Sequence, residues 1–143
     1  KDYDFILIDC PPAADSNIPQ SALLVSDLAL VPIIPSPLDL WASVGIRKVI
    51  ENVSTVNEGL VSRLLLNECR PNTTLAKEVT EVLPEFGIPL CKTYLGQREV
   101  YRQSPTFGQT VFDFGRDAAV AVTEMEALTA ELLTLLEGRE TNA

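Results

Sequence analysis

A short, purely apolar run near the start of the chain constrains its fold most strongly. Residues 5–8 are Phe, Ile, Leu and Ile, and Asp9 follows them directly. A strand that is apolar at every position is typical of the buried centre of a parallel sheet. Ligands of such sheets bind at the carboxyl ends of the strands, so Asp9 is a candidate ligand for Mg²⁺. The alternative is a strand-end residue that caps the next turn, which Pro11 and Pro12 stiffen.

Apolar runs and segments of helical periodicity alternate along the rest of the chain. Strands are predicted over residues 28–34, 60–66 and 88–94, and Pro32 favours an early end of the first, near residue 31 or 33. Five helical segments are expected. They run from Asp15 or Ser16 to near Ser26-Asp27, from Ser36 to Gly59, from Thr73 or Thr74 to just before Gly87, as a turn over 97–103, and from Asp113 to just before Gly138, with a loop over 104–110. This order predicts one α/β domain, a three-layer, mostly parallel sheet with helices on both faces.

Composition narrows the classes of function. The 143 residues suit a single globular domain, with 46% hydrophobic and 22% charged residues. A net charge of −9 argues against bulk attraction to nucleic acid or an anionic membrane, although a local basic patch is compatible with it. The chain contains no histidine, which excludes Ser/His/Asp and Cys/His nucleophilic schemes. The three cysteines, Cys10, Cys69 and Cys91, are odd in number and far apart, which suggests neither a disulfide framework nor a zinc ribbon, so a reducing cytoplasm is expected. No apolar run reaches the ~20 residues of a membrane span.

Four segments in order carry a family resemblance. Residues 3–12 resemble the Walker B and switch II segment of the ParA/MinD superfamily of deviant-Walker ATPases, with Cys10 where that family usually has Thr. Residues 29–40 resemble the strand and helix start that follow it, and Leu65-Leu66-Asn67 resembles a strand end whose asparagine contacts adenine. Residues 97–101, with Gly108 and Val111-Phe112, resemble the small ParA-type plasmid partition proteins.

The resemblance implies a P-loop NTPase-like fold that uses ATP or ADP with Mg²⁺. By this resemblance Asp9 organises the metal, Pro11 and Pro12 relay the state of the nucleotide, and Asn67 holds the adenine. Relatives form ATP-dependent homodimers that bind nonspecific DNA in plasmid or chromosome segregation, associate with the nucleoid in the cytoplasm, and respond to a centromere-binding ParB-like adaptor. Arg98 and Arg102 lie four apart on one helical face, so they are candidate DNA contacts; the alternative is a solvated surface.

One part of the family pattern has no counterpart. No Gly-x-x-x-x-Gly-Lys-Ser/Thr run occurs in these residues, so no catalytic phosphate-loop lysine can be assigned. We therefore expect the chain to represent the C-terminal portion of such an ATPase and to bind triphosphate poorly by itself. An unpaired edge at residues 5–8 would favour self-association, a complementing fragment or a longer chain. The alternatives are a non-catalytic dimerisation or partner-binding module, a MinD-like division-site regulator, or an amidotransferase-linked synthetase.

Overall fold

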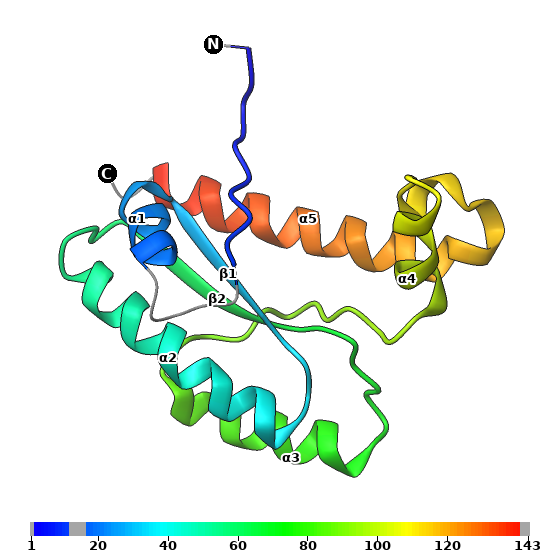
Figure 1. Ribbon diagram of the computed structural model, residues 1–143, viewed down its shortest axis with the longest axis horizontal. Coiled ribbons are helices and arrows are strands. Elements are labelled where there is room, and N and C mark those ends of the chain that lie inside the picture. The colour runs from blue at the N-terminus through cyan, green and yellow to red at the C-terminus, as the bar shows by residue number, and fades with distance from the viewer. Residues whose placement is uncertain (1, 12–16, 141–143) are drawn as a thin grey trace.

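The computed structural model describes residues 2–11 and 17–140, and two parallel strands lie at its centre (Figure 1). The elements follow in the order α1 (Asn17–Val25), β1 (Leu28–Ile33), α2 (Pro37–Ser54), β2 (Val61–Leu66), α3 (Thr74–Val82), η1 (Leu83–Phe86), α4 (Glu99–Thr106), η2 (Val111–Asp113), η3 (Gly115–Ala118) and α5 (Ala119–Glu140), where η denotes a 3₁₀ helix. None of the described helices has the length and apolarity needed to cross a bilayer.

The two strands pair in parallel, with Leu28 opposite Val61 and Ile33 opposite Leu66. The predicted strand over 88–94 is an interrupted neighbour of β2, held by parallel bridges from Leu64 to Leu90 and from Cys69 to Gly96. Pro89 lacks an N–H, which weakens a regular ladder there. The described residues therefore form an α/β structure with a two-stranded parallel sheet, as the predicted fold class requires. The wider three-layer sheet stays a prediction.

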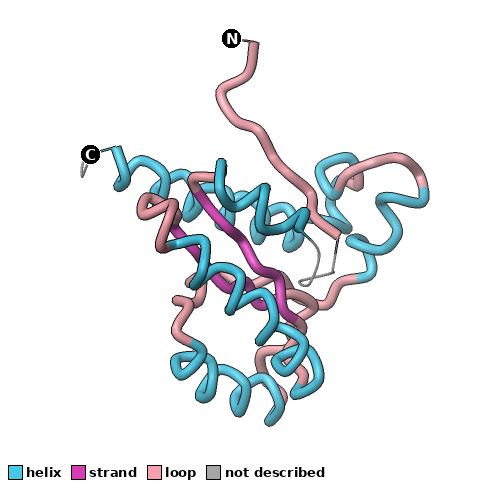
Figure 2. The backbone as a smooth tube through the Cα atoms, turned by 60° about the vertical axis from the view of Figure 1, so that its left-hand side comes forward, coloured by secondary structure: helices cyan, strands magenta, loops and turns pink. Residues whose placement is uncertain are grey.

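Helices cover both faces of this small sheet (Figure 2). Successive strand residues point to opposite faces, so β2 sends Leu64 and Leu66 to one side and Leu65 to the other. Leu64 and Leu66 belong to the main core, together with buried residues of α1, α2 and α3. Leu65 packs in a second cluster with Leu128 of α5. The apolar pattern of β2 therefore serves two separate cores.

Side-chain caps explain where two helices begin. The Asp39 N–H donates to Ser36 Oγ at 3.1 Å before α2, and the Ala76 N–H donates to Thr73 Oγ1 at 3.3 Å before α3. Three boundaries were predicted wrongly. α2 ends at Ser54 and not near residue 59. α4 continues into the expected loop as far as Thr106, and Asp113 forms a capping box with Thr110 in η2 instead of capping α5. Asp113 therefore belongs to the 3₁₀ helix η2, and η3 separates it from the start of α5 at Ala119.

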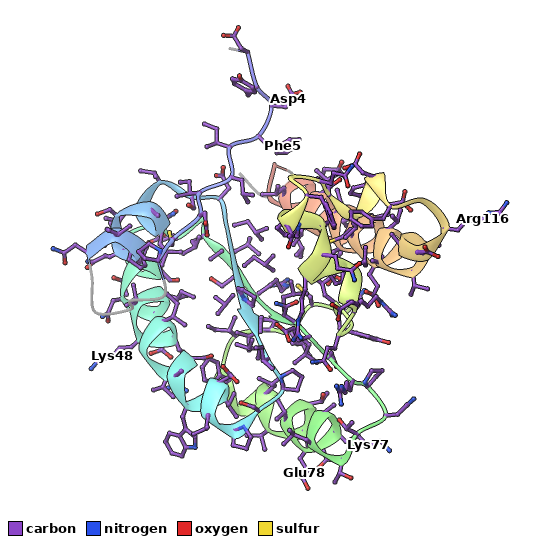
Figure 3. All side chains as sticks on the ribbon, turned by 45° about the vertical axis from the view of Figure 1, so that its right-hand side comes forward. Asp4, Phe5, Lys48, Lys77, Glu78 and Arg116 are labelled. Atoms are coloured by element: carbon purple, nitrogen blue, oxygen red, sulfur yellow. The ribbon has the colours of Figure 1, made fainter. Side chains whose placement is uncertain are left out.

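The prediction of a buried strand over residues 5–8 is wrong for this structure. The segment is extended but unpaired, with Ile6 86% and Leu7 98% exposed, and it leads away from the body of the molecule (Figures 1 and 3). An apolar run shows which side chains favour burial, but a strand also needs a neighbour that accepts its backbone hydrogen bonds. No described segment pairs with residues 5–8. Asp15 and Ser16, the expected caps of α1, lie outside the described residues.

Candidate functional site

A cavity of about 340 Å³ opens beyond the carboxyl end of β2. One wall is the loop from Cys69 to Thr73, which leads into α3, and the other is the segment from Tyr94 to Arg98, which leads into α4. Backbone hydrogen bonds hold the two walls together, because the Cys69 N–H donates to the Leu95 carbonyl at 2.9 Å and the Gln97 N–H donates to the Cys69 carbonyl at 3.0 Å. The cavity thus lies where parallel sheets bind their ligands.

Its lining combines amides, guanidinium groups and one aromatic ring. Asn72 and Gln97 supply amides, Arg70 and Arg98 supply positive charge, and Tyr94 supplies the ring. Arg70 donates from Nε to Gln97 Oε1 and so joins the two walls. Amides offer donors and acceptors together, while a guanidinium plane stacks on flat rings. This combination fits a planar heterocycle that carries hydrogen-bonding groups.

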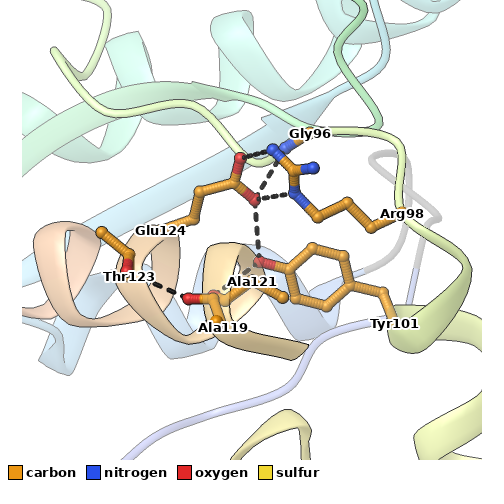
Figure 4. Close-up of polar contacts among 7 residues, drawn as sticks. All are labelled: Gly96, Arg98, Tyr101, Ala119, Ala121, Thr123 and Glu124. Carbon is orange, nitrogen blue, oxygen red and sulfur yellow. Dashed lines mark hydrogen bonds and ion pairs between the residues drawn. The ribbon is translucent and has the colours of Figure 1, made fainter. Parts of the chain in front are cut away.

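A carboxylate from α5 fixes the second wall (Figure 4). Glu124 accepts two hydrogen bonds from Arg98, at 3.0 Å from Nε and 2.6 Å from Nη2. It also accepts the Gly96 N–H at 3.2 Å and the Tyr101 hydroxyl at 3.2 Å. The Ala121 carbonyl lies 3.1 Å from the same hydroxyl oxygen, so Glu124 and Ala121 share the single hydrogen of Tyr101. One side chain therefore ties the cavity wall to both α4 and α5.

The electrostatics follow from this geometry. Burial alone raises the pKa of Glu124, but the hydrogen bonds from Arg98 and Gly96 and the Arg98 charge outweigh it, so the pKa lies below its ordinary value. Burial, with the Glu124 charge, raises the pKa of Tyr101 to about 12. The same two causes raise the pKa of the Cys69 thiol. At neutral pH the network therefore consists of an ionised Glu124, a charged Arg98 and a neutral Tyr101.

A second carboxylate repeats the contact two turns further along α5. Glu131 accepts the backbone N–H groups of Lys92 and Thr93 at 2.7 and 2.8 Å. Burial alone raises its pKa, but these hydrogen bonds lower it below the usual value. Neither Lys92 nor Thr93 lines the cavity beyond β2. Glu131 thus makes the same kind of contact as Glu124, away from the candidate site.

The residues that the sequence predicted fall into two groups. Asn67 directly follows β2, is half-buried, and donates its N–H to the Ile33 carbonyl at 2.8 Å, two residues before the cavity wall begins. Asp9 and Pro11 are exposed on the extended N-terminal segment, and Pro12 lies outside the described residues. Residues 2–11 and 17–140 contain no group of three or more His, Cys, Asp or Glu side chains that could hold a metal ion. Neither Asn67 nor Asp9 lines the cavity, although Asn67 lies close to its first wall along the chain.

Both candidate DNA contacts are engaged with carboxylates. Arg98 pairs with Glu124, as described above, and Arg102 pairs with Glu68 at 2.8 Å across the surface. A DNA phosphate would have to compete with these partners, so each positive charge is locally balanced. Contact of Arg98 and Arg102 with DNA stays a prediction.

Sequence reasoning missed that Gln97 lines the cavity and that Glu124 and Tyr101 form the hydrogen-bond network behind its second wall. One signal was available, because Glu124 and Glu131 are seven residues apart and bracket the buried Leu128 on one face of a helix. Acidic residues within such an apolar stripe indicate specific partners, since unpaired charges are costly to bury. The sequence alone did not show which loop supplies those partners.

Sequence comparison identifies one matching family and several related proteins. Residues 1–66 match a family described as an AAA domain. The maintenance of carboxysome distribution protein A of Halothiobacillus neapolitanus is 32% identical over 131 residues, which is 92% of this chain and 61% of that protein. The protein of the same name from Gloeobacter kilaueensis is 26% identical over 91% of this chain and 59% of its own length. An uncharacterised Pseudomonas putida protein is 29% identical over 92% of this chain and 50% of its own length.

The chain spans between half and about three-fifths of the length of these curated relatives. The similarity to the Halothiobacillus protein extends over 92% of the chain, well beyond the 66 residues of the family match. Together the matches show that the chain is similar to two carboxysome distribution proteins and that its first 66 residues match the AAA-domain family.

Proposed function

We propose that these residues form part of a ParA/MinD-like ATPase that positions a large body inside the cell. The 32% identity across 92% of the chain to a carboxysome distribution protein carries this proposal. The name of that relative describes maintenance of the distribution of an assembly, and a second relative from a different organism has the same name. Positioning of a cargo is therefore the activity that we transfer to this chain.

In this proposal the complete protein binds ATP or ADP with Mg²⁺, and the base of the nucleotide lies in the cavity beyond β2. The amides and guanidinium groups of that cavity fit a purine, and Asn67 lies at the adjoining strand end. Asp9 is the proposed Mg²⁺-organising carboxylate, with Pro11 and Pro12 as the switch beside it. Assembly of that end of the site requires groups besides Asp9, because one carboxylate is a weak Mg²⁺ site. The working form in this proposal is an ATP-dependent homodimer.

Plasmid or chromosome partition is a second candidate function. The residues at 97–101, together with Gly108 and Val111-Phe112, resemble the partition members of the superfamily, and this observation favours it. In that case the cargo is DNA, the dimer binds nonspecific DNA, and the partner is a ParB-like adaptor. The engagement of Arg98 and Arg102 with carboxylates makes both less available to phosphates.

The test uses the full chain encoded by the gene. ATP binding is measured by calorimetry with and without Mg²⁺, for the wild type, for Asp9→Ala and for Asp4→Ala. Asp4 is a matched control, because it is an exposed acidic residue on the same extended segment (Figure 3). We expect Mg²⁺-dependent binding that Asp9→Ala weakens and Asp4→Ala does not. A wild type that binds no ATP would refute the proposal.

The cellular test separates the two cargoes. The gene carrying Asp9→Ala replaces the wild-type gene, and the spacing of intracellular bodies and the retention of plasmids are followed over many generations. Irregular spacing with normal plasmid retention supports positioning of an assembly. Plasmid loss with normal spacing supports partition instead.

A further inference from the structure

The contacts of Glu124 single it out among the residues near the candidate nucleotide site. Its carboxylate receives four hydrogen bonds from three residues, two of which line the cavity. The Glu124 side chain itself is only 12% exposed and does not line the cavity. It therefore acts on the site through the groups that it holds.

We propose that Glu124 is a positioning residue that fixes Arg98 and Gly96 as the wall against which the base of a bound adenine nucleotide lies. This inference rests on the proposed nucleotide function. Nε and Nη2 of Arg98 are both taken by Glu124, so the guanidinium plane is set before any ligand arrives. Without this partner the Arg98 side chain would be free to rotate, and a ligand would have to order it on binding, which would reduce the affinity.

The backbone at Gly96 shows how closely the wall and the carboxylate approach each other. A Cβ atom at this position would lie 3.0 Å from Arg98 Nη2 and 3.0 Å from Glu124 Oε1. Both distances are tighter than ordinary carbon contacts, so an added Cβ would push the ends of the two paired side chains away by a few tenths of an ångström. Gly96 is thus suited to the arrangement by its lack of a side chain, and its N–H completes the contacts of Glu124.

Glu131 separates positioning from mere stabilisation. It lies on the same helix as Glu124 and accepts the backbone N–H groups of Lys92 and Thr93. These two residues come just before the second cavity wall along the chain and do not line the cavity. Glu124→Gln and Glu131→Gln are therefore matched substitutions. Both oxygens of each carboxylate accept hydrogen bonds. A Gln side chain keeps one oxygen and has an NH₂ group in place of the other, so in either orientation the NH₂ group faces a donor and one hydrogen bond is lost.

The experiment measures competition against a fluorescent ATP analogue on the full chain encoded by the gene, with Mg²⁺ present. The competitors are ATP and inorganic tripolyphosphate, which lacks the base and sugar. The proteins are wild type, Glu124→Gln, Gly96→Ala and Glu131→Gln. Gly96→Ala disturbs the same ion pair without a change of charge, so it decides the matter if Glu124→Gln does not fold.

We expect Glu124→Gln and Gly96→Ala to weaken ATP binding about tenfold, the order that results when the ligand must order a long side chain itself. Tripolyphosphate binding should change less than about twofold in both, and Glu131→Gln should leave both ligands within about twofold of wild type. The inference is overturned if ATP binding is unchanged, if tripolyphosphate weakens in parallel with ATP, or if Glu131→Gln has the same effect. A wild type that binds no ATP analogue refutes the proposed function itself, which is a distinct result.

Discussion

The ion pair between Arg98 and Glu124 should contribute more to stability than its appearance as a single contact near the surface indicates. Two N–H···O bonds, at 2.6 and 3.0 Å, join the side chains, which are 34% and 12% exposed. Arg47 and Glu51 on α2 form a natural comparison at 3.0 Å, with side chains 36% and 55% exposed. The two arginines are equally exposed, so the difference between the pairs lies in the acid and in the number of hydrogen bonds.

The expected magnitudes follow from burial of the carboxylate. Exposed i,i+4 pairs contribute about 0.3–0.5 kcal/mol. A hydrogen bond to a charged group contributes about 1.5–3 kcal/mol when it is well buried. Because solvent screens the exposed part of Arg98, we expect a coupling free energy of about 1.5 kcal/mol for Arg98 and Glu124. Arg98→Met alone should cost about 2–3 kcal/mol, since it leaves Glu124 buried with only neutral donors.

The assay is a double-mutant cycle on urea unfolding at neutral pH. Arg98→Met, Glu124→Gln and the double variant form one cycle, and Arg47→Met, Glu51→Gln and their double variant form the other. The Arg47 guanidinium also lies 5.5 Å from the centre of the Phe86 ring, but that contact cancels in the coupling term. Equal coupling free energies in the two cycles would refute the reasoning from burial.

Three further predictions concern the core, the thiols and the response to acid. Leu64→Ala, at a fully buried position, should cost about 2–5 kcal/mol in urea unfolding, while Val56→Ala, at a side chain 75% exposed, should change stability by less than about 0.5 kcal/mol. In the native protein a thiol reagent at pH 8 should modify the exposed Cys10 and leave the buried Cys91 intact until the protein unfolds. The reason is that burial, followed by the Glu131 charge, raises the pKa of the Cys91 thiol to about 11. Equal rates of modification of Cys10 and Cys91 would contradict this. Because the pKa of Glu131 is lower in the folded protein than its unfolded-state value of about 4.3, the ionised carboxylate stabilises the fold above that pH. This stabilisation is lost as the pH falls through the folded-state pKa. In Glu131→Gln the free energy of unfolding should therefore decrease less between about pH 5 and 3 than in the wild type.

Local signals predicted much of the fold correctly. β1, β2, α2 and α3 occur where apolar runs, caps and helical periodicity placed them, although α2 ends at Ser54 and not near residue 59. Ser36 and Thr73 cap their helices, as expected. These signals succeed because each depends on neighbours within a few residues. The errors at α4 and α5 arose because a proline and an aspartate served roles that the simplest pattern did not indicate. Pro105 lies inside the last turn of α4, and Asp113 closes a 3₁₀ turn.

Long-range partners limited what could be predicted for the candidate site. The sequence identified Asn67 at a strand end, but the cavity beyond it depends on the loop from Tyr94 to Arg98, which lies beside β2 only in the folded chain. The run at 5–8 shows the opposite limit, because its composition favours burial while no described neighbour pairs with it. Apolar composition identifies a preference, and pairing depends on a partner that composition does not identify.

Glu124 connects the packing of α5 to the wall of the cavity. Leu128, one turn further along, packs with Leu65 in the second core, so the helix that supplies the carboxylate is held against the sheet by apolar contacts. Glu124 then transfers that fixed position to Arg98 and Gly96 through hydrogen bonds. A ligand that favours the ordered wall must also favour the docked helix, because the same contacts define both. The apolar face of α5 thereby helps to determine the shape of a site that none of its residues lines.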